Sequence, residues 1–180
     1  MNNRPARRAR AKGEDMSEQQ GKKVSETSIT MGSTMLPQDA NHMGNVHGGV
    51  VMKHIDATGG VVAMRHAGRM VVTASIDRLD FHHPVYVGDL LILKACVNHV
   101  GSTSMEVGVR VEAETLPTGK PRHTASAYLT YVALDENGGP CQVPPLIVES
   151  PAEQRRYDQA VDRRSSRLAE KKRERAARDK

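Results

Sequence analysis

The side chains best suited to chemistry lie in one short stretch, residues 39–60, where a polar loop runs into an apolar helix. Asp56 is the single carboxylate of that predicted helix. A buried acid in a small domain is costly unless it is paired or neutralised, so we interpret Asp56 as a general base or a nucleophile. Asn45, in the loop, offers an amide that can hold a water molecule or a substrate carbonyl. The competing interpretations are a solvent-facing acid for Asp56 and a helix cap for Asn45.

The start of this helix offers further polar groups. Gly48 and Gly49 allow a substrate to approach the backbone, and the free N–H groups of a helix start can form an oxyanion site. We expect His47 to shape the loop by hydrogen bonding, and contact with the substrate is its alternative role. The eight histidines lack the His-x3-His spacing of a helical metal site, so we predict neither a metal nor a bound cofactor.

The elements that position these residues can be read from hydrophobic periodicity. Apolar residues recur at helical spacing over 47–66, and Gly68 ends that helix. A loose alternation over 24–36 predicts a first strand, and four more strand-like segments follow the helix, at 70–81, 90–100, 104–113 and 123–134. The intervals between them are too short for crossover helices, which predicts antiparallel pairing. We therefore expect an α+β fold with one long central helix wrapped by a curved antiparallel sheet of five to six strands.

Charge divides the chain into three parts. Residues 1–23 carry seven Lys or Arg against three acids, residues 152–180 carry eleven against six, and the body between them carries eight against twelve. We predict a disordered basic arm at 1–23, a folded domain at 24–151 and a basic tail at 152–180, either a solvated helix or disordered. The two basic segments either associate with nucleic acid or a membrane surface or act only as solubilising extensions.

Composition narrows the location and the class. Cys96 and Cys141 have neither CxxC spacing nor the density of a disulfide framework, which favours a reduced, cytoplasmic compartment. The longest apolar runs are far shorter than the roughly 18 residues that span a bilayer. Tryptophan is absent and Phe81 is the only phenylalanine, so an aromatic surface for stacking nucleic-acid bases is not expected.

Several motifs, taken together and in order, resemble the hotdog-fold acyl-CoA thioesterases, specifically the acyl-CoA hydrolase branch. The resemblance extends from about Met31 to Val148 and leaves both basic segments outside it. The segments that carry it are 44–49, 52–56, 80–85 with 88–89, 101–107, 131–134 and 143–145.

The resemblance implies a hotdog thioesterase domain over 24–151 that hydrolyses acyl-CoA to a free acid and coenzyme A. It implies a site built across two subunits, in which Asn45 of one faces Asp56 of the other, and a homodimer that commonly assembles into a trimer of dimers. The turn Ser102, Thr103 and Ser104 would lie along the pantetheine or its phosphates. The candidate partners for phosphate in the weakly basic body are Arg65, Lys94 and Arg122.

Two rival functions remain open at this point. One is a non-catalytic acyl-CoA-binding or regulatory module whose basic segments engage nucleic acid, and the presence of both candidate catalytic residues speaks against it. The other is a hotdog dehydratase, which would need a different catalytic pairing around the helix, and the sequence shows none. Acyl-chain length is not encoded in any of these motifs.

Overall fold

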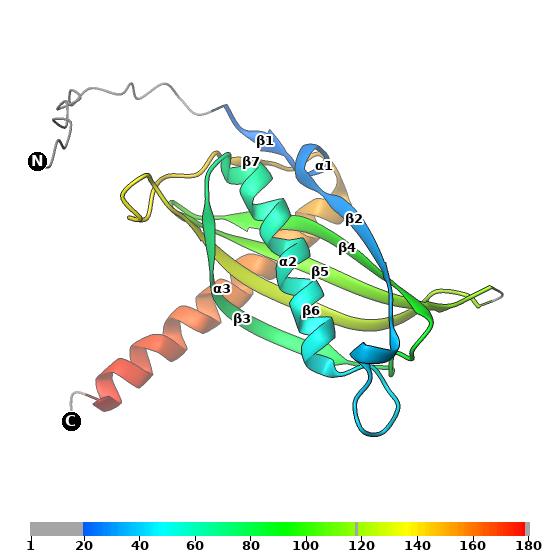
Figure 1. Cartoon of the computed structure of the whole chain (residues 1–180). Helices are drawn as coiled ribbons and strands as arrows, with labels where there is room; N and C mark the ends of the chain where they lie inside the picture. Colours follow the sequence, from blue (N-terminus) through cyan, green and yellow to red (C-terminus); the bar gives the residue numbers. More distant parts are fainter. Residues whose placement is uncertain (1–19, 118, 179–180) are drawn as a thin grey trace, which may run out of the picture.

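A five-stranded antiparallel sheet curves around one long helix, as the computed structural model of residues 20–117 and 119–178 shows (Figure 1). The elements in chain order are β1 (Lys22–Lys23), α1 (Val24–Thr27), β2 (Ile29–Thr34), η1 (Pro37–Asp39), α2 (Gly48–Ala67), β3 (Val71–Phe81), β4 (Asp89–Val100), β5 (Ser104–Thr115), β6 (Arg122–Ala133), β7 (Leu146–Ile147) and α3 (Pro151–Arg178).

The sheet has the order β2-β4-β5-β6-β3, with every neighbouring pair antiparallel. The predicted α+β hotdog architecture is confirmed, and each of the four strands expected after the helix agrees with the structure to within two residues. Short hairpins join β4 to β5 and β5 to β6, whereas β3 crosses to the far side of β6. As a result β2 and β3 are the two edges of the sheet, and β3 is an edge strand of 11 residues.

The central helix α2 packs on the inner, concave face of the sheet. The His47 side chain caps its start, and Gly68 ends it in the left-handed region at φ 64°, which glycine adopts at little cost. The side chains of Val51, Ile55 and Val62 are at most 1% exposed and meet the alternating apolar residues of β4, β5 and β6. This single layer of aliphatic contacts is the core that holds the helix in place.

The C-terminal helix α3 crosses the opposite, outer face of the sheet (Figure 1). Composition favours a solvated or disordered segment at 152–180, and the structure departs from that expectation as far as Arg167, which pairs with Asp77 of β3. The first half lies against the sheet, where Ala160 is fully buried and Arg163 forms an ion pair of 2.6 Å with Glu106. Charged contacts hold this helix, so a hydrophobic pattern could not reveal that it docks.

The N-terminal prediction also needs adjustment. Within 24–36, the predicted first strand is a short helix, α1, followed by β2. Lys22 and Lys23 pair in parallel with Leu146 and Ile147, so the predicted disordered arm does not extend to residue 23. The rest of that predicted arm, residues 1–19, lies outside the described residues.

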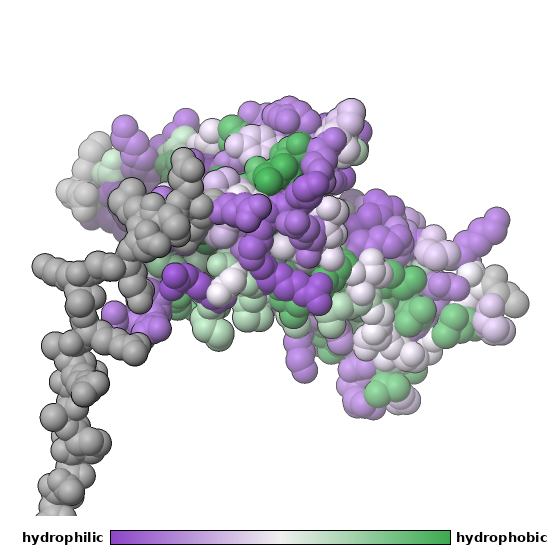
Figure 2. Space-filling model, turned by 90° about the horizontal axis from the view of Figure 1, so that it is seen from above, coloured by the Kyte–Doolittle hydropathy of each residue, from purple (hydrophilic) through white to green (hydrophobic). Residues whose placement is uncertain are grey.

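The surface seen from above is mixed in character. Hydrophilic residues predominate in Figure 2, and the hydrophobic ones form small groups rather than one broad patch. Among the described residues, no helix has the length and apolar character needed to cross a membrane.

Candidate active site

Asp56 lies in the middle of α2 and is half-buried in the single chain. One of its carboxylate oxygens, Oδ1, accepts a hydrogen bond of 2.7 Å from the Thr73 hydroxyl and a longer one of 3.3 Å from the Tyr131 hydroxyl. These two donors hold the carboxylate in a defined orientation. Its other oxygen, Oδ2, forms no hydrogen bond with a described residue, so it is available to a water molecule or a substrate.

Tyr131 reaches Asp56 from beneath the helix. It belongs to β6, it is 1% exposed, and its hydroxyl also donates to the backbone carbonyl of Asp56 at 2.9 Å. Burial and the adjacent Asp56 carboxylate raise the pKa of the Tyr131 hydroxyl, so it remains a neutral donor at physiological pH.

Gly59 makes room for that tyrosine. A Cβ atom at position 59 would lie 2.5 Å from the Tyr131 hydroxyl oxygen, a distance at which one of the two must shift. The glycine pair Gly59-Gly60 weakens the helix intrinsically, and the close approach of the Tyr131 ring explains its first member.

The loop before α2 forms a separate hollow of about 290 Å³, which Asn41 and Asn45 line together with Gly48 and Phe81. The backbone N–H of Asn41 donates to the carbonyl of Asn45 at 2.6 Å, and the side-chain oxygen of Asn41 accepts from the N–H of Met43. Both asparagines are partly exposed, so either amide can meet a ligand in the hollow.

His47 has a local structural role in the chain. Its Nδ1 accepts the N–H of Gly49 at 2.9 Å, which caps the helix and occupies one of the two predicted oxyanion donors. The N–H of Gly48 has no hydrogen-bond partner among the described residues, and the residue faces the Phe81 ring. Of the two glycine donors, the one at Gly48 is therefore the one open to a ligand.

The loop and Asp56 do not meet within one chain. Asp56 follows Gly48 by eight positions of the helix, which corresponds to roughly 12 Å along the helix axis. Asp56 does not line the hollow that contains Asn45. Within one chain, Asp56 and the loop hollow therefore lie at different positions along the helix.

The predicted coenzyme A residues are spread over three regions. Arg65 is exposed in the last turn of α2, whereas the hollow lies at the first turn. Ser102, Thr103 and Ser104 lie at the β4–β5 turn. There the backbone carbonyl of Ser102 accepts a hydrogen bond from the N–H of Val143, and the carbonyl of Thr103 accepts one from the N–H of Ala133. This turn, like Arg65, is remote from the hollow.

The other two predicted phosphate partners are already paired. Arg122 forms a 2.5 Å ion pair with the buried Asp89. Lys94 lies on the outer face of the sheet, bonded to Glu112 at 2.7 Å, on the side away from α2. A single chain thus does not bring the predicted phosphate partners together.

Three residues of the site were not among those that the sequence singled out. Thr73 and Tyr131 follow Asp56 by 17 and 75 residues and lie in strands, where ordinary β propensity accounts for both. Asn41 stands in the same loop as Asn45 and was not given a role of its own. The sequence signal for Asn41 was its position in a polar loop before an apolar helix. Tyr131 lies in the segment 131–134 that carries the family resemblance, whereas Thr73 carries no comparable signal.

No cluster of three His, Cys, Asp or Glu side chains with metal-binding geometry occurs within 20–117 and 119–178. The groups that the candidate site presents are the Asp56 carboxylate, the hydroxyls of Thr73 and Tyr131, the asparagine amides of the loop and the Gly48 N–H.

Comparison with known proteins identifies the family of this chain. The family model described as thioesterase superfamily matches residues 43–120. The Bacillus subtilis acyl-CoA thioester hydrolase YkhA is 38% identical over 147 residues, which cover 82% of this chain and 86% of that protein.

Solved structures extend the likeness to the fold. A hexameric acyl-CoA thioesterase, solved without ligand, is 41% identical and superimposes with a TM-score of 0.81 over 84% of this chain and 97% of that one. The Staphylococcus aureus acyl-CoA hydrolase, solved with butyryl coenzyme A, coenzyme A and coenzyme A disulfide, is 38% identical with a TM-score of 0.81 over 87% and 95%. That enzyme has also been solved with an aspartate, an asparagine or a threonine replaced by alanine. By sequence and fold, this chain belongs to the acyl-CoA thioester hydrolases of the thioesterase superfamily.

Proposed function

We propose that the chain hydrolyses acyl-CoA to a carboxylic acid and coenzyme A, with Asp56 as the general base or nucleophile. The observation that carries this proposal is the Asp56 carboxylate, which the hydroxyls of Thr73 and Tyr131 orient through one oxygen and which leaves the other open. Such an oxygen can take a proton from water or attack the thioester carbon itself. In either case the carbonyl oxygen of the thioester becomes negative and needs hydrogen-bond donors. The N–H of Gly48, at the start of α2, is suited to that task.

The substituted residues of the Staphylococcus aureus enzyme support a specific set of partners. Its aspartate follows the asparagine by 15 residues and precedes the threonine by 17. In this chain Asp56 follows Asn41 by 15 residues and precedes Thr73 by 17, whereas Asn45 is only 11 residues away. The three residue types and both spacings coincide, so we favour Asn41 as the amide that faces Asp56. Asn45 remains the neighbour that shapes the same hollow.

A second subunit is part of this proposal. The strand β3 is an edge strand, and the side chains of Val72, Ile76 and Phe81 on it are 39–50% exposed. An unpaired edge with apolar side chains is a ready surface for another copy of the chain. Thr73, which binds Asp56, lies on that strand, so a partner docked there would place its own loop near Asp56.

The proposal extends to the oligomeric assembly of the protein and to its cellular location. The hexameric thioesterase supports a homo-oligomer. Its proposed basic unit is a homodimer, and its proposed full assembly is a trimer of dimers. Both cysteines are unpaired, which supports a cytoplasmic location. We retain the prediction that no metal or bound cofactor takes part, with coenzyme A as the leaving group.

Mixing of inactive variants tests both the residues and the subunit arrangement. Asp56→Asn and Asn41→Ala should each release almost no thiol from acyl-CoA. After subunit exchange, verified by mass spectrometry, the mixture should recover activity, because a mixed dimer has one site with an intact Asn41 and an intact Asp56. Asn45→Ala by itself distinguishes the two asparagines, because it should keep its turnover if Asn41 is the amide that faces Asp56. Verified exchange between the Asp56→Asn and Asn41→Ala variants without recovery would mean that the site lies within one chain.

A further inference from the structure

The connection between β3 and β4, residues 82–88, forms one wall of the hollow at the start of α2. Pro84 and Val85 of this connection line the hollow together with Asn41 and Asn45. The side chain of Val85 is 4% exposed and belongs to the hydrophobic core. Because the wall is part of the hollow, the position of its backbone determines the shape of the site.

The loop that carries both asparagines is attached to this connection by its backbone. The N–H of Val46 donates to the carbonyl of Val85 at 2.8 Å, and Asn45 forms a β-bridge with Tyr86. The N–H of Asn41 in turn donates to the carbonyl of Asn45 at 2.6 Å. A shift of the connection therefore moves Asn45 and, through Asn45, also Asn41.

The segment that leads into the same loop is attached to this connection as well. The N–H of Gly88 donates to the carbonyl of Met35 at 2.8 Å, and the N–H of Met35 donates to the carbonyl of Asp89 at 2.9 Å. Gly88 has a φ of 88°, in the left-handed region that glycine adopts at little cost. Both ends of the stretch from residue 35 to residue 46 are thus bonded to the backbone of residues 85–89.

A buried carboxylate, that of Asp89, fixes the end of the connection. Asp89 is 1% exposed, and its Oδ2 accepts from the N–H of Tyr86 at 2.9 Å and from Nη2 of Arg122 at 2.5 Å. Its Oδ1 accepts from the Thr115 hydroxyl at 2.7 Å. Burial by itself raises the pKa of Asp89, but these hydrogen bonds outweigh burial and lower it below its ordinary value, so the carboxylate is ionised. An ionised carboxylate at this depth needs a cation beside it.

Arg122, the first residue of β6, is that cation, and it also contacts the wall of the hollow. Its Nη2 donates to the backbone carbonyl of Pro84 at 3.3 Å, and its Nη1 donates to the Thr115 hydroxyl at 3.0 Å. The guanidinium carbon lies 5.7 Å from the centre of the Tyr86 ring. A planar guanidinium can bond several acceptors at once, which a lysine ammonium cannot do with the same geometry. One side chain thus joins β6 to both Pro84 and Tyr86.

We propose that Arg122 and Asp89 are positioning residues for hydrolysis: they fix the connection 82–88, which in turn holds Asn41 at the thioester. This inference rests on the proposed function, because it assigns both residues to the same site. Arg122 and Asp89 act through the loop and not through contact with the substrate. Arg122 is accordingly not a phosphate partner of coenzyme A.

Amide hydrogen exchange of the full-length protein, measured by mass spectrometry, tests the structural step without a substrate. Arg122→Gln should raise the exchange rate of the peptide 36–50 by about tenfold or more, since a charged hydrogen bond contributes roughly that factor. Peptides from β5 are the internal reference and should keep their rates. Arg163→Gln is the matched control, because it also removes the ionic partner of a buried carboxylate, Glu106. It should change the exchange of 36–50 by less than about twofold.

Hydrolysis of two substrates distinguishes positioning from phosphate binding. The two are an acyl-CoA and the matching acyl-pantetheine, which has the same thioester but no phosphate. Arg122→Gln should lower kcat by about 10- to 100-fold for both substrates alike, because a displaced amide affects the reacting thioester in each. Arg122→Lys keeps a charge beside Asp89, and it should fold even if the glutamine variant does not and recover part of kcat. Lys23→Gln removes the cation of an exposed ion pair with Glu149 and should leave kcat within about twofold.

Several results would overturn the proposal. An unchanged exchange rate of 36–50 in both Arg122 variants would do so, as would an equal increase in the Arg163→Gln control. A higher KM for acyl-CoA alone, with acyl-pantetheine unaffected, would make Arg122 a phosphate partner instead. Failure of the proposed function is recognised separately, as an unsubstituted protein that releases no thiol from any acyl-CoA. In that case the exchange measurement still decides whether Arg122 holds the loop.

Discussion

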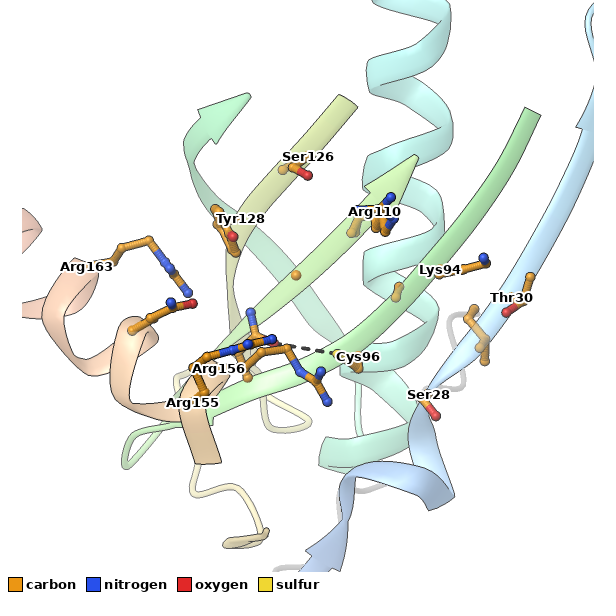
Figure 3. Close-up of a pocket in the computed structure, with 17 residues that line it drawn as sticks. Ser28, Thr30, Lys94, Cys96, Arg110, Ser126, Tyr128, Arg155, Arg156 and Arg163 are labelled. Carbon is orange, nitrogen blue, oxygen red and sulfur yellow. Dashed lines mark hydrogen bonds between the residues drawn. The ribbon is translucent and has the colours of Figure 1, made fainter. Parts of the chain in front are cut away.

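The two faces of the sheet are held by different kinds of interaction. On the inner face, α2 packs through aliphatic side chains such as Val51 and Ile55, and its catalytic candidate, Asp56, is its single acid. On the outer face, α3 docks through the ion pairs of Arg163 and Arg167, and through the buried Ala160 and the contact of the Tyr157 ring with His99. On the inner face, aliphatic packing holds α2 in place and thereby positions the Asp56 carboxylate. The outer arrangement leaves basic side chains and a groove beside the helix (Figure 3).

The largest effect should come from the inner face. Replacing Asp56 by Asn should lower kcat/KM for acyl-CoA by about 1,000-fold, because an amide can neither accept the proton nor attack the thioester. Thiol release from a panel of acyl-CoAs, from short to long chains, measures this and reveals the chain preference. Asp158→Asn, an exposed acid of α3, is the matched control and should leave the rate unchanged. An Asp56→Asn enzyme with normal turnover would remove the inner face from catalysis.

On the outer face the main expected effect is on stability. Arg163→Gln should lower the free energy of unfolding by about 2–3 kcal/mol, because it leaves Glu106, only 3% exposed, without its ionic partner. The stacking of Arg163 over the Tyr128 ring, at 3.7 Å, is lost as well. Urea denaturation measures the change. Arg175→Gln, on the exposed end of α3, should stay within about 0.5 kcal/mol of the unsubstituted protein. Equal effects at the two positions would mean that the ion pair does not hold the helix.

The contact between α2 and Tyr131 gives a smaller, more specific test. Gly59→Ala should destabilise the protein by about 1–3 kcal/mol, because the added methyl meets the Tyr131 hydroxyl. In the Tyr131→Phe variant the same substitution should cost less, since the closest atom is gone. A double-mutant cycle by thermal or urea unfolding measures this coupling. If the losses of unfolding free energy from Gly59→Ala and Tyr131→Phe are additive, the helix and the ring adjust to each other without strain.

The smallest effect is a change in how stability depends on pH. His66, fully buried in α2, binds the Pro144 carbonyl through Nε2, and burial lowers its pKa below the ordinary value of 6.5. The unfolded chain therefore takes up a proton that the folded chain does not, and stability falls as the pH drops below that value.

Burial also lowers the pKa of His99 and of His123, so these residues contribute to the pH dependence of stability in the same direction. Substitution of His66 isolates the contribution of His66. His66→Gln should make the curve of unfolding free energy between pH 7 and pH 5 shallower, by at most about 1.4 kcal/mol per pH unit, the value for one proton. Urea denaturation at a series of pH values provides the curve. An identical slope in the variant would mean that His66 is protonated in the folded state.

The sequence alone determined the central helix, the four antiparallel strands that follow it and the position of one acid in an apolar helix. Each depends on a periodic or local pattern, because residues that share a face recur at fixed spacing. The tertiary structure alone decided what surrounds Asp56 and what holds α3. Thr73 and Tyr131 come from distant strands, and the Glu106–Arg163 pair joins residues 57 positions apart. Such contacts leave no periodic trace, because they depend on where two elements meet in space.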